Sequence, residues 1–399
     1  MPSQTVVIVG GGVIGLSAAY HLARSQSARV IVIEKQSIGS GSSSRAAGIT
    51  TGLLWSETGV KARRVGIERF RQLSRELQGY AYHDQQGCLN LFTPETWKLR
   101  QPLLELYDRL GAEYHVLDAQ MIRQCWPALH PPGDFIGLHD PNGGYSEPEE
   151  YMAALLRRLR ELHVEIVEGQ QVEDFILSGD RVIGVRTASD HFDADAVISG
   201  VHSWSLLLWR TLGFQLPIKS FVHQRFVSAP LDEPFVSPPV NADPYLGYIR
   251  PARGQRILLG VETGQRPECQ IDRAAFSMDE LAVSKNVRDE AVERFGSFIP
   301  TIKNARWESH HIGLIAFSMD GEPILGPVKS LPGLFVAGAF HSGGFSYNAV
   351  AGLLLAEMVT DKQTSVDISA FSPDRFSAAA TREYLKMPRV QDQAVRRRH

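Results

Sequence analysis

The chain has 399 residues, of which 43% are hydrophobic and 21% are charged, and this composition is typical of a globular protein with room for two domains. Its 41 basic and 44 acidic residues give a net charge of −3, so charge provides no basis for binding nucleic acid or an anionic membrane. No apolar run reaches the roughly 18 residues that a membrane-spanning helix requires. The three cysteines, Cys88, Cys125 and Cys269, match no metal or redox spacing, so we expect no metal site and reduced thiols.

The N-terminal segment predicts a βαβ unit. "TVVIVGGGVIGLSAAYHLARS" contains a short β-branched run, a glycine turn and an amphipathic helix, and "ARVIVIEK" reads as the next strand. Because the first strand begins near Thr5 and its glycines follow at once, we expect no cleaved signal peptide and a cytoplasmic protein.

Two longer helices are predicted in the next part of the chain. An apolar stripe predicts a helix at 59–77, whereas 80–140 looks less regular. A second helix is predicted at 146–162, where Ser146 and Glu149 have the spacing of a capping box. Strands are then predicted in "VEIVEG", "DRVIGVRT" and "ADAVISG".

The sequence pattern changes between 217 and 316. Short β-rich segments there predict a mostly antiparallel sheet, which a helical piece at 278–295 interrupts. The segment "GLFVAGAFHSGGFSYNAVAGLLLAEMV" then returns to a strand, a glycine-rich turn and a helix. We therefore predict an α/β protein with an α+β insertion, in which a Rossmann-like dinucleotide-binding domain encloses a mostly antiparallel sheet.

The predicted domains are discontinuous in sequence. The dinucleotide-binding domain is expected to comprise 1–80, 145–215 and 317–375, and the inserted substrate domain 81–144 and 216–316, with a C-terminal tail at 376–399.

The first glycine turn matches G-x-G-x-x-G from Gly10 to Gly15. Gly10 permits a tight turn, Gly12 lets backbone approach a pyrophosphate, and Gly15 allows close packing of helix and strand. The free N–H groups of the following helix favour phosphate binding. Glu34 ends the second strand at the distance where a carboxylate accepts the ribose hydroxyls. This combination predicts a bound dinucleotide and does not distinguish NAD from FAD.

Several blocks along the chain resemble one known family. They are the first glycine motif, Glu34-Lys35, "GSGSSSRAAG" at 39–48, "ADAVISGVHSWS", "GYIRPARGQRILLG", "MDGEPILGP" and "GLFVAGAFHSGGFSYNAVAG". In content, order and spacing they resemble the D-amino-acid oxidase-type family of FAD-dependent oxidoreductases. This family includes glycine oxidase, sarcosine oxidases and the β subunits of sarcosine and proline dehydrogenases. The resemblance covers nearly the whole chain.

The resemblance implies that FAD is held by two separate glycine turns. In that family the first motif binds the ADP half and the last block closes over the isoalloxazine. The helix N-terminus, expected near Asn348, would then point its dipole at the N1–C2 edge of the ring. The residues implied to contact FAD are Gly10, Gly12, Val13, Ile14, Gly15, Glu34, Lys35, Ser43, Ser44, Arg45, Ala47, Gly48, Ile49, Val172, Gly200, Trp204, Gly313, Gly338, Gly343, Gly344, Phe345 and Ser346.

The chain departs from the family pattern on the substrate side. Ile315 stands where glycine oxidase-type members carry an arginine for the substrate carboxylate. Ser346 replaces a lysine of the monomeric sarcosine oxidases. Gly313 stands nearest to the position of the cysteine that attaches FAD covalently in those oxidases. We therefore expect non-covalent FAD and a different contact for a substrate anion.

Arg250 is the predicted replacement, because a guanidinium can hold a carboxylate through two parallel hydrogen bonds. A structural arginine in the sheet is the alternative. His341 could orient the substrate or accept a proton from its amine, and a purely structural histidine is the alternative there. The predicted catalytic residues are His341, Arg250 and Tyr248, and the predicted substrate contacts are Arg45, Tyr245, Arg250 and Ser346.

The resemblance implies an FAD-dependent oxidoreductase that oxidises the C–N bond of a small primary or secondary amine or amino acid. Hydride transfer to flavin N5 would give an imine that hydrolyses, and O₂ or an electron-acceptor partner would reoxidise the flavin. Three alternatives remain open: a catalytic β-type subunit of a hetero-oligomeric sarcosine or proline-type dehydrogenase, a 2-hydroxy acid oxidoreductase, and a non-enzymatic flavin-binding protein. A homo- or hetero-oligomer is compatible with each of them.

Overall fold

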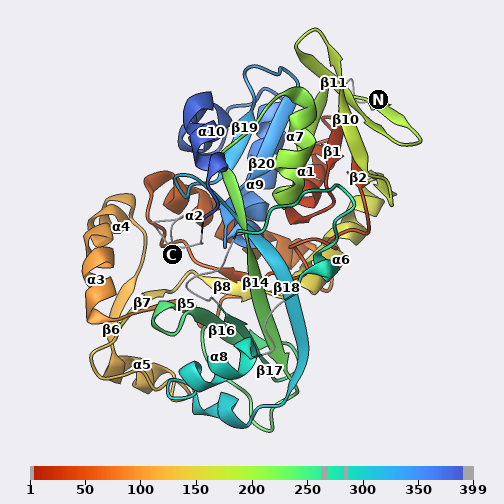
Figure 1. Ribbon diagram of the computed structural model, residues 1–399. Coiled ribbons are helices and arrows are strands. Elements are labelled where there is room, and N and C mark those ends of the chain that lie inside the picture. The colour runs from red at the N-terminus through yellow and green to blue at the C-terminus, as the bar shows by residue number, and fades with distance from the viewer. Residues whose placement is uncertain (1–3, 262–267, 283–285, 390–399) are drawn as a thin grey trace.

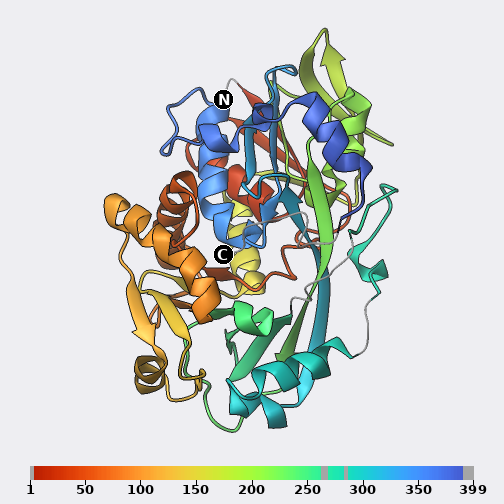
Figure 2. The same cartoon turned by 60° about the vertical axis from the view of Figure 1, so that its left-hand side comes forward.

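The computed structural model describes residues 4–261, 268–282 and 286–389. Two large sheets lie one beyond the other, and the long strands β14 and β18 extend from the region of the first into the second (Figures 1 and 2). A mixed α/β fold with a parallel sheet and a largely antiparallel sheet is therefore confirmed. Within the described ranges, no helix combines the length and the apolar character needed to cross a membrane.

The first sheet has six strands in the order β19-β20-β13-β1-β2-β9, all parallel except β19, which pairs antiparallel with β20. Its central strand is almost wholly apolar and buried, as a strand covered on both faces must be. The strands are β1 (Thr5–Val9), β2 (Arg29–Glu34), β9 (Glu165–Glu168), β13 (Ala196–Ser199), β19 (Ile324–Pro327) and β20 (Leu334–Gly338).

Different elements pack on the two faces of this sheet, because alternate side chains of β1 belong to two different apolar clusters. Val6 and Ile8 pack with a cluster built from helices, whereas Val7 and Val9 pack with a small antiparallel sheet and α7. The helices are α1 (Val13–Arg24), α2 (Glu57–Glu76), α6 (Pro148–Glu161) and α9 (Gly344–Val359). The second cover comprises β10 (Val172–Ser178), β11 (Arg181–Thr187), β12 (His191–Asp193) and α7 (Ser205–Trp209).

The second sheet has nine strands in the order β21-β18-β14-β17-β16-β15-β5-β7-β6, antiparallel except for the β15–β5 pair. The helix α8 (Val287–Phe295) shares an apolar cluster with it. Its strands are β5 (Cys88–Phe92), β6 (His115–Asp118), β7 (Ile136–Asp140), β14 (Ile218–Ser228), β15 (Val240–Ala242), β16 (Gly247–Ala252), β17 (Arg256–Val261), β18 (Trp307–Ser318) and β21 (Phe340–His341).

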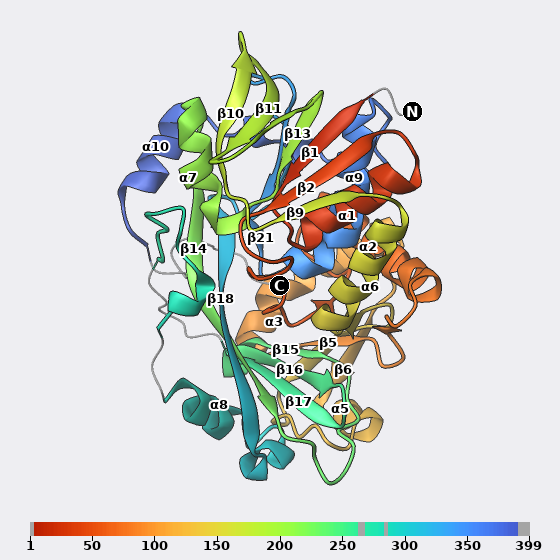
Figure 3. The same ribbon diagram turned by 90° about the vertical axis from the view of Figure 1, so that its right-hand side faces the viewer.

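The last strand of that sheet belongs to the second glycine turn. In β21, His341 pairs with Ala316 of β18 and Phe340 pairs with Phe317. Figure 3 shows β21 between β18 and the strands of the first sheet. Apart from β21 and the end of β18, the strands of this sheet lie within the predicted inserted segments, and the exact domain boundaries remain a prediction.

The remaining elements include several that the sequence pattern did not reveal. A small sheet has the order β3-β8-β4. Its strands are β3 (Ile49–Thr50), β4 (Tyr82–His83) and β8 (Gly144–Ser146), and the shorter helices are α3 (Pro94–Arg100), α4 (Leu104–Leu110), α5 (Ala119–Cys125) and α10 (Ala378–Lys386). Short 3₁₀ turns occur at Gln101–Leu103, His202–Trp204, Arg210–Leu212, Asp243–Tyr245, Met278–Glu280, Pro300–Asn304, Ser369–Phe371 and Pro373–Arg375.

Two local predictions were wrong. The stretch 80–140 is regular, but its helices span only seven residues each, too few to show a clear periodicity. The capping box does not form, because Ser146 ends β8 and its Oγ lies 2.8 Å from the Tyr80 hydroxyl. The segment predicted as a C-terminal tail, 376–399, contains α10 after Ser377; its last residues, 390–399, lie outside the described ranges, and its boundary remains a prediction.

A buried ion pair joins the two sheets through the serine-rich loop. Arg250 of β16 is fully buried and holds Glu147 bidentately, with both N–O distances at 2.8 Å. Its Nε also donates to the carbonyl of Ala47 at 2.6 Å, and its guanidinium lies 4.6 Å from the ring centroid of Tyr145. Although burial raises the pKa of Glu147, the charge of Arg250 lowers it below its usual value. The pair is therefore charged at neutral pH.

A second arginine holds the same loop. Arg225 of β14 donates from Nη2 to the carbonyl of Ser44 at 2.7 Å and to Glu149 at 2.9 Å. Glu147 and Glu149 both lie at the start of α6. Two arginines of the nine-stranded sheet thus fix loop carbonyls against the helix layer of the first sheet.

We expect Arg250→Met to lower the free energy of unfolding by about 3–5 kcal/mol, because it leaves the Glu147 charge buried and unpaired. Arg253→Met is the matched control, since Arg253 pairs with Glu150 at 2.8 Å while its side chain is 78% exposed. That surface pair should contribute about 1 kcal/mol or less. Denaturant titration of both variants checks this, and equal losses would contradict a structural role for the buried pair.

Candidate functional site

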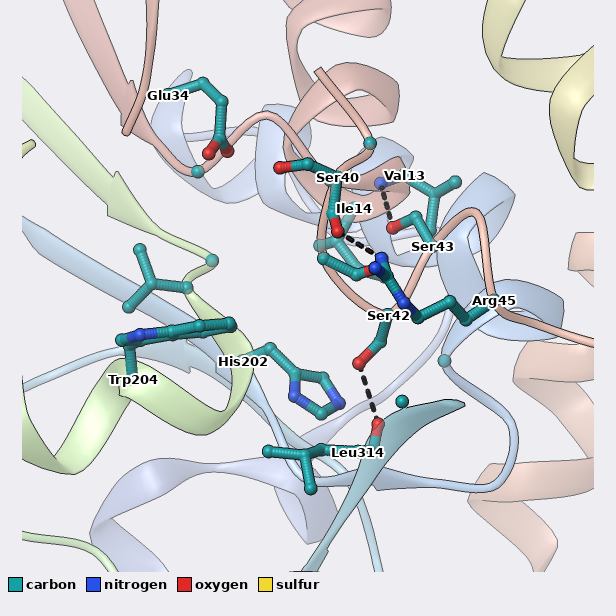
Figure 4. Close-up of a pocket in the computed structure, with 18 of the residues that line it drawn as sticks. Val13, Ile14, Glu34, Ser40, Ser42, Ser43, Arg45, His202, Trp204 and Leu314 are labelled. Atoms are coloured by element: carbon teal, nitrogen blue, oxygen red, sulfur yellow. Dashed lines mark hydrogen bonds between the residues drawn. The ribbon is translucent and has the colours of Figure 1, made fainter. Parts of the chain in front are cut away.

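A cavity of about 400 Å³ is bordered by both glycine turns. Its walls come from the β1–α1 turn, the end of β2, the serine-rich loop, the start of β10, the segment after β13, strands β14, β16 and β18, and the β21–α9 turn. Segments more than 300 residues apart therefore share one cavity, with the first turn and the second turn both on its wall. Figure 4 shows part of this wall.

The first glycine turn has the geometry of a dinucleotide cradle. Gly10 has φ +108°, and a Cβ there would lie 2.9 Å from the Gly200 carbonyl oxygen. At Gly12 a Cβ would lie 3.1 Å from Ser43 Oγ, which accepts a hydrogen bond from the N–H of Val13 at 3.0 Å (Figure 4). Since a side chain would fill this space, the turn presents bare backbone to the cavity. The residues present therefore fit a bound pyrophosphate.

The acid at the end of β2 is fixed by backbone. Glu34 accepts hydrogen bonds from the N–H groups of Gly11 at 2.8 Å and Gln36 at 3.0 Å, and it lines the cavity beside the first turn. Its carboxylate is thus oriented without a cationic side chain. The ribose contact implied by the family resemblance remains a prediction.

Lys35 lines the cavity and also holds the segment that contains Ala274, another lining residue. Its Nζ donates to the carbonyls of Ala274 at 3.1 Å and Phe276 at 2.6 Å, and lies 4.0 Å from the ring centroid of Trp204. Burial lowers the pKa of Lys35. Sequence reasoning did not anticipate that residues 274–276 reach this wall, because no local pattern links them to β2.

The serine-rich loop lies along β18. Ser42 Oγ donates to the Leu314 carbonyl at 2.7 Å (Figure 4). The Arg45 guanidinium binds the carbonyls of Ser40 and Gly41 and pairs with Asp279 at 2.7 Å. A Cβ on Gly313 would lie 3.1 Å from the Arg45 Cδ, so the absence of a side chain at 313 leaves room for this arginine.

Three polar rings from the nine-stranded sheet line the cavity. The Tyr248 hydroxyl lies 2.7 Å from His223 Nε2, and the two rings are nearly parallel, at 15°. His341 is buried at φ +47°, with its ring centroid 4.9 Å from that of Trp55. Sequence reasoning identified Tyr248 and His341 but missed His223. Strand alternation places His223 on the same face of β14 as Arg225, and this was the signal that could have found it.

His202 also lines the cavity, where it is half-buried in a left-handed conformation with φ +49°. Its Nδ1 lies 2.6 Å from Ser203 Oγ. Burial lowers the pKa of His202 to about 4. At neutral pH it therefore adds a neutral polar ring to the wall, not a charge.

The second glycine turn brings the start of α9 to the cavity. Gly344 and Phe345 line it, and Gly343 is the residue before the first helical turn. The helix therefore begins earlier than the predicted position at Asn348. Asn348 is fully buried inside α9, where its Oδ1 accepts a hydrogen bond from the Tyr151 hydroxyl at 2.6 Å.

Several predicted substrate residues lie away from the cavity. Arg250 is paired with Glu147, as described above, so the structure does not support it as a carboxylate contact. Tyr245 stacks on Phe298 with centroids 5.2 Å apart, beneath α8. Ser346 is buried and donates its hydroxyl to the Ile49 carbonyl. Among the predicted anion contacts, Arg45 alone lies on the cavity wall as described.

The predicted FAD contacts divide in the same way. Those on the cavity wall are Gly10, Gly12, Val13, Ile14, Glu34, Lys35, Ser43, Arg45, Ala47, Val172, Gly200, Trp204, Gly313, Gly344 and Phe345. Those outside the lining are Gly15, Ser44, Gly48, Ile49, Gly338, Gly343 and Ser346. Two of the latter are glycines because the backbone passes close to them. At Gly15 and Gly48 a Cβ would collide with the carbonyls of Gly10 and Ser146.

Comparison with known proteins agrees with this geometry. Residues 5–358 match the model of the family described as DAO, FAD dependent oxidoreductase. The chain is 28% identical to 4-methylaminobutanoate oxidase (formaldehyde-forming) of Paenarthrobacter nicotinovorans over 95% of its own length, and it spans 46% of that protein, about half. It is 27% identical to sarcosine oxidase subunit beta of an Arthrobacter species, with 94% of this chain and 91% of the relative covered.

Solved structures establish the fold. L-proline dehydrogenase from P. horikoshii matches with a TM-score of 0.85 at 23% identity, covering 94% of this chain and 98% of that one. Glycine oxidase from Geobacillus kaustophilus matches with a TM-score of 0.81 at 24% identity, covering 94% and 99%. The family match, the cavity and the fold lead to one conclusion. The chain belongs to the DAO family of FAD-dependent oxidoreductases, as the resemblance implied.

Proposed function

We propose that the chain binds FAD non-covalently in this cavity and oxidises the C–N bond of a small amine or amino acid. The observation that carries the proposal is that one cavity extends from the first glycine turn to the rings of His223, Tyr248 and His341. A dinucleotide cradle and a set of proton-handling side chains therefore share one space. The 2-hydroxy acid and non-enzymatic alternatives have no separate structural observation in their favour.

The residues that would hold FAD are those of the two turns and the loop between them. The backbone of the first turn and the Ser43 hydroxyl suit the pyrophosphate, and Glu34 suits the ribose. The first residues of α9 suit the other end of the cofactor. When bound, FAD supplies the two-electron acceptor for the hydride that leaves the amine carbon.

Non-covalent attachment is supported by the position of the cysteines. Cys88 is buried, Cys125 is exposed and Cys269 is half-buried, and none of the three is on the cavity wall. Gly313 stands on that wall without a side chain. Separated cysteines also favour the cytoplasm as the compartment, which remains a prediction.

The side chains of Tyr248 and His223 provide a route for the amine proton. An amine must be deprotonated before its lone pair can assist hydride departure from the adjacent carbon. Because the Tyr248 hydroxyl and His223 Nε2 are 2.7 Å apart, a proton accepted by one can pass to the other. His341, on the same wall, orients the substrate in this proposal.

An N-methylated amino acid is the substrate class we propose first. The relatives described above include one named for 4-methylaminobutanoate and one named for sarcosine, and both names denote secondary amines with a carboxylate. Lys35 and Arg45 are both on the cavity wall, and we propose Arg45 for such a carboxylate, since its partner Asp279 is largely exposed and can be displaced.

A β-type subunit of a hetero-oligomeric enzyme is the second candidate. One observation favours it: the chain covers 91% of a relative that is itself named as a beta subunit. Co-purification of a second polypeptide with the native protein distinguishes this arrangement from a homo-oligomer or monomer.

Anaerobic mixing of the holoenzyme with a substrate panel tests the reaction. We expect N-methyl amino acids to bleach the flavin absorbance, because hydride loss from a secondary amine reduces the cofactor. Primary amino acids, simple amines and 2-hydroxy acids form the comparison set. Bleaching by hydroxy acids alone, or by no member of the panel, would contradict the proposed reaction.

Gly10→Ala should weaken FAD binding by about tenfold, because relief of the strain at φ +108° and of the Cβ contact with the Gly200 carbonyl displaces the turn that would hold the pyrophosphate. Gly213→Ala is the matched control, with φ +65° and open space around its Cβ. Titration of each apoprotein with FAD gives the dissociation constants. Equal weakening in both variants counts against the cradle, and flavin that stays attached to denatured protein counts against non-covalent binding.

Tyr248→Phe should lower kcat/KM by roughly 100-fold, because it removes the hydroxyl that completes the proton route. Tyr245→Phe removes a hydroxyl outside the cavity and should leave kcat/KM unchanged. The comparison is made across pH with the best substrate from the panel. Unchanged kinetics in the Tyr248 variant would exclude the pair from proton transfer.

A further inference from the structure

Arg63 is a buried cation that forms no ion pair with an acidic side chain in the described part of the chain. It lies on α2, and its side chain is turned away from solvent, with 3% of the residue exposed. Its guanidinium stacks over the ring of Tyr347 in α9, with Cζ 4.1 Å from the ring centroid. Its Nε has no hydrogen-bond acceptor. By contrast, Arg71 on the same helix is paired with two acidic side chains.

The groups that interact most strongly with Arg63 are neutral. They are Tyr347, Tyr82 and Cys88, and burial raises the pKa of each of these three side chains. Burial also lowers the pKa of Arg63 itself, but a guanidinium starts so high that it stays charged at neutral pH. A buried charge without an ion-pair partner lowers the stability of the folded state, so folding by itself gives no reason for an arginine at this position.

The guanidinium lies directly behind the second glycine turn. A Cβ built on Gly343 would be 3.3 Å from Arg63 Cζ, would overlap its Nη2, and would lie 2.8 Å from His341 Cε1. Gly343 precedes the 16-residue helix α9, whose N-terminal end carries the positive pole of its dipole. Two sources of positive potential therefore meet at one turn, although a cation at a helix N-terminus is normally destabilising.

The other side of this turn is the cavity wall. His341, Ser342, Gly344 and Phe345 line the cavity, whereas Arg63 does not. Arg63 therefore acts on the cavity contents through the backbone of the turn, without touching them. A negative charge at this end of the cavity would balance both positive sources together.

We propose that Arg63 is a positioning residue for charge: through the Gly343 turn it stabilises the anionic reduced form of the bound flavin relative to the oxidised form. The inference rests on the proposed FAD site. A hydride carries two electrons and one proton, so its transfer from the amine carbon leaves a cationic imine and adds one negative charge to the flavin. Positive potential at this turn favours that product.

The test measures the two-electron midpoint potential of the substrate-free holoenzyme. We expect Arg63→Met to weaken binding of reduced FAD at least tenfold more than binding of oxidised FAD, which lowers the potential by about 30 mV. Arg63→Lys keeps the charge and should restore most of the potential. Arg100→Met is the matched control, because Arg100 is also a buried arginine but lies on α3, near the ring of Phe92.

Gly343→Ala carries the test if Arg63→Met does not fold. It keeps the arginine and displaces the guanidinium from the turn, so the potential should again fall. A potential equal to wild type in the folded variant, or an equal fall in Arg100→Met, would overturn the proposal. So would a tenfold weaker binding of acetate with an unchanged potential, since Arg63 would then serve a substrate carboxylate.

This readout is separate from the proposed reaction. The potential is measured without any amine, so failure of every amine in the panel leaves it interpretable. Conversely, an unchanged potential in an active enzyme would overturn the role of Arg63 and leave the reaction in place.

Discussion

The bidentate contact between Arg250 and Glu147 is the constraint on which the site geometry depends. One guanidinium joins β16 of the nine-stranded sheet, the start of α6 and the carbonyl of Ala47. Because both charges are buried, neither side chain can move away without leaving the other unpaired. The loop that carries Ser43 and Arg45 is therefore held in one place between the sheets. Because both residues line the cavity, this part of its wall is held in place as well.

Two buried arginines illustrate opposite uses of the same side chain. Arg250 is neutralised by a carboxylate from this chain, so its contribution is mechanical. Arg63 has only neutral neighbours among its strongest partners, so its charge remains to act on whatever lies beyond the Gly343 turn. Both arginines are buried, and their roles differ because only Arg250 has a carboxylate partner. A buried arginine is thus uninformative about function until its anion has been identified.

Local sequence rules predicted the parts of the site that depend on backbone geometry. The first motif and the second glycine turn were recognisable because a bare turn between a strand and a helix has few sequence solutions. The partner of Arg250 was not predictable in this way, since Glu147 is 103 positions earlier in the chain. Lys35 shows the same limit, because residues 274–276 reach it only through the tertiary fold. His223 is an intermediate case. Side chains alternate between the two faces of β14, so the face of His223 follows once the face of one neighbouring residue is known.

In the proposed function, the attachment of β21 to β18 lets the substrate contacts differ while the cofactor end of the cavity keeps its position. Backbone pairing of His341 with Ala316 ties the second glycine turn to the strand that carries Gly313 and Ile315. The distance between the flavin end of the cavity and that strand is therefore set by main-chain hydrogen bonds, which do not depend on side-chain identity. Side chains along β18 can vary within this frame. The resemblance implies that Ile315 stands where glycine oxidase-type members carry an arginine, so in the proposed function we expect a different contact for the substrate within the same strand frame.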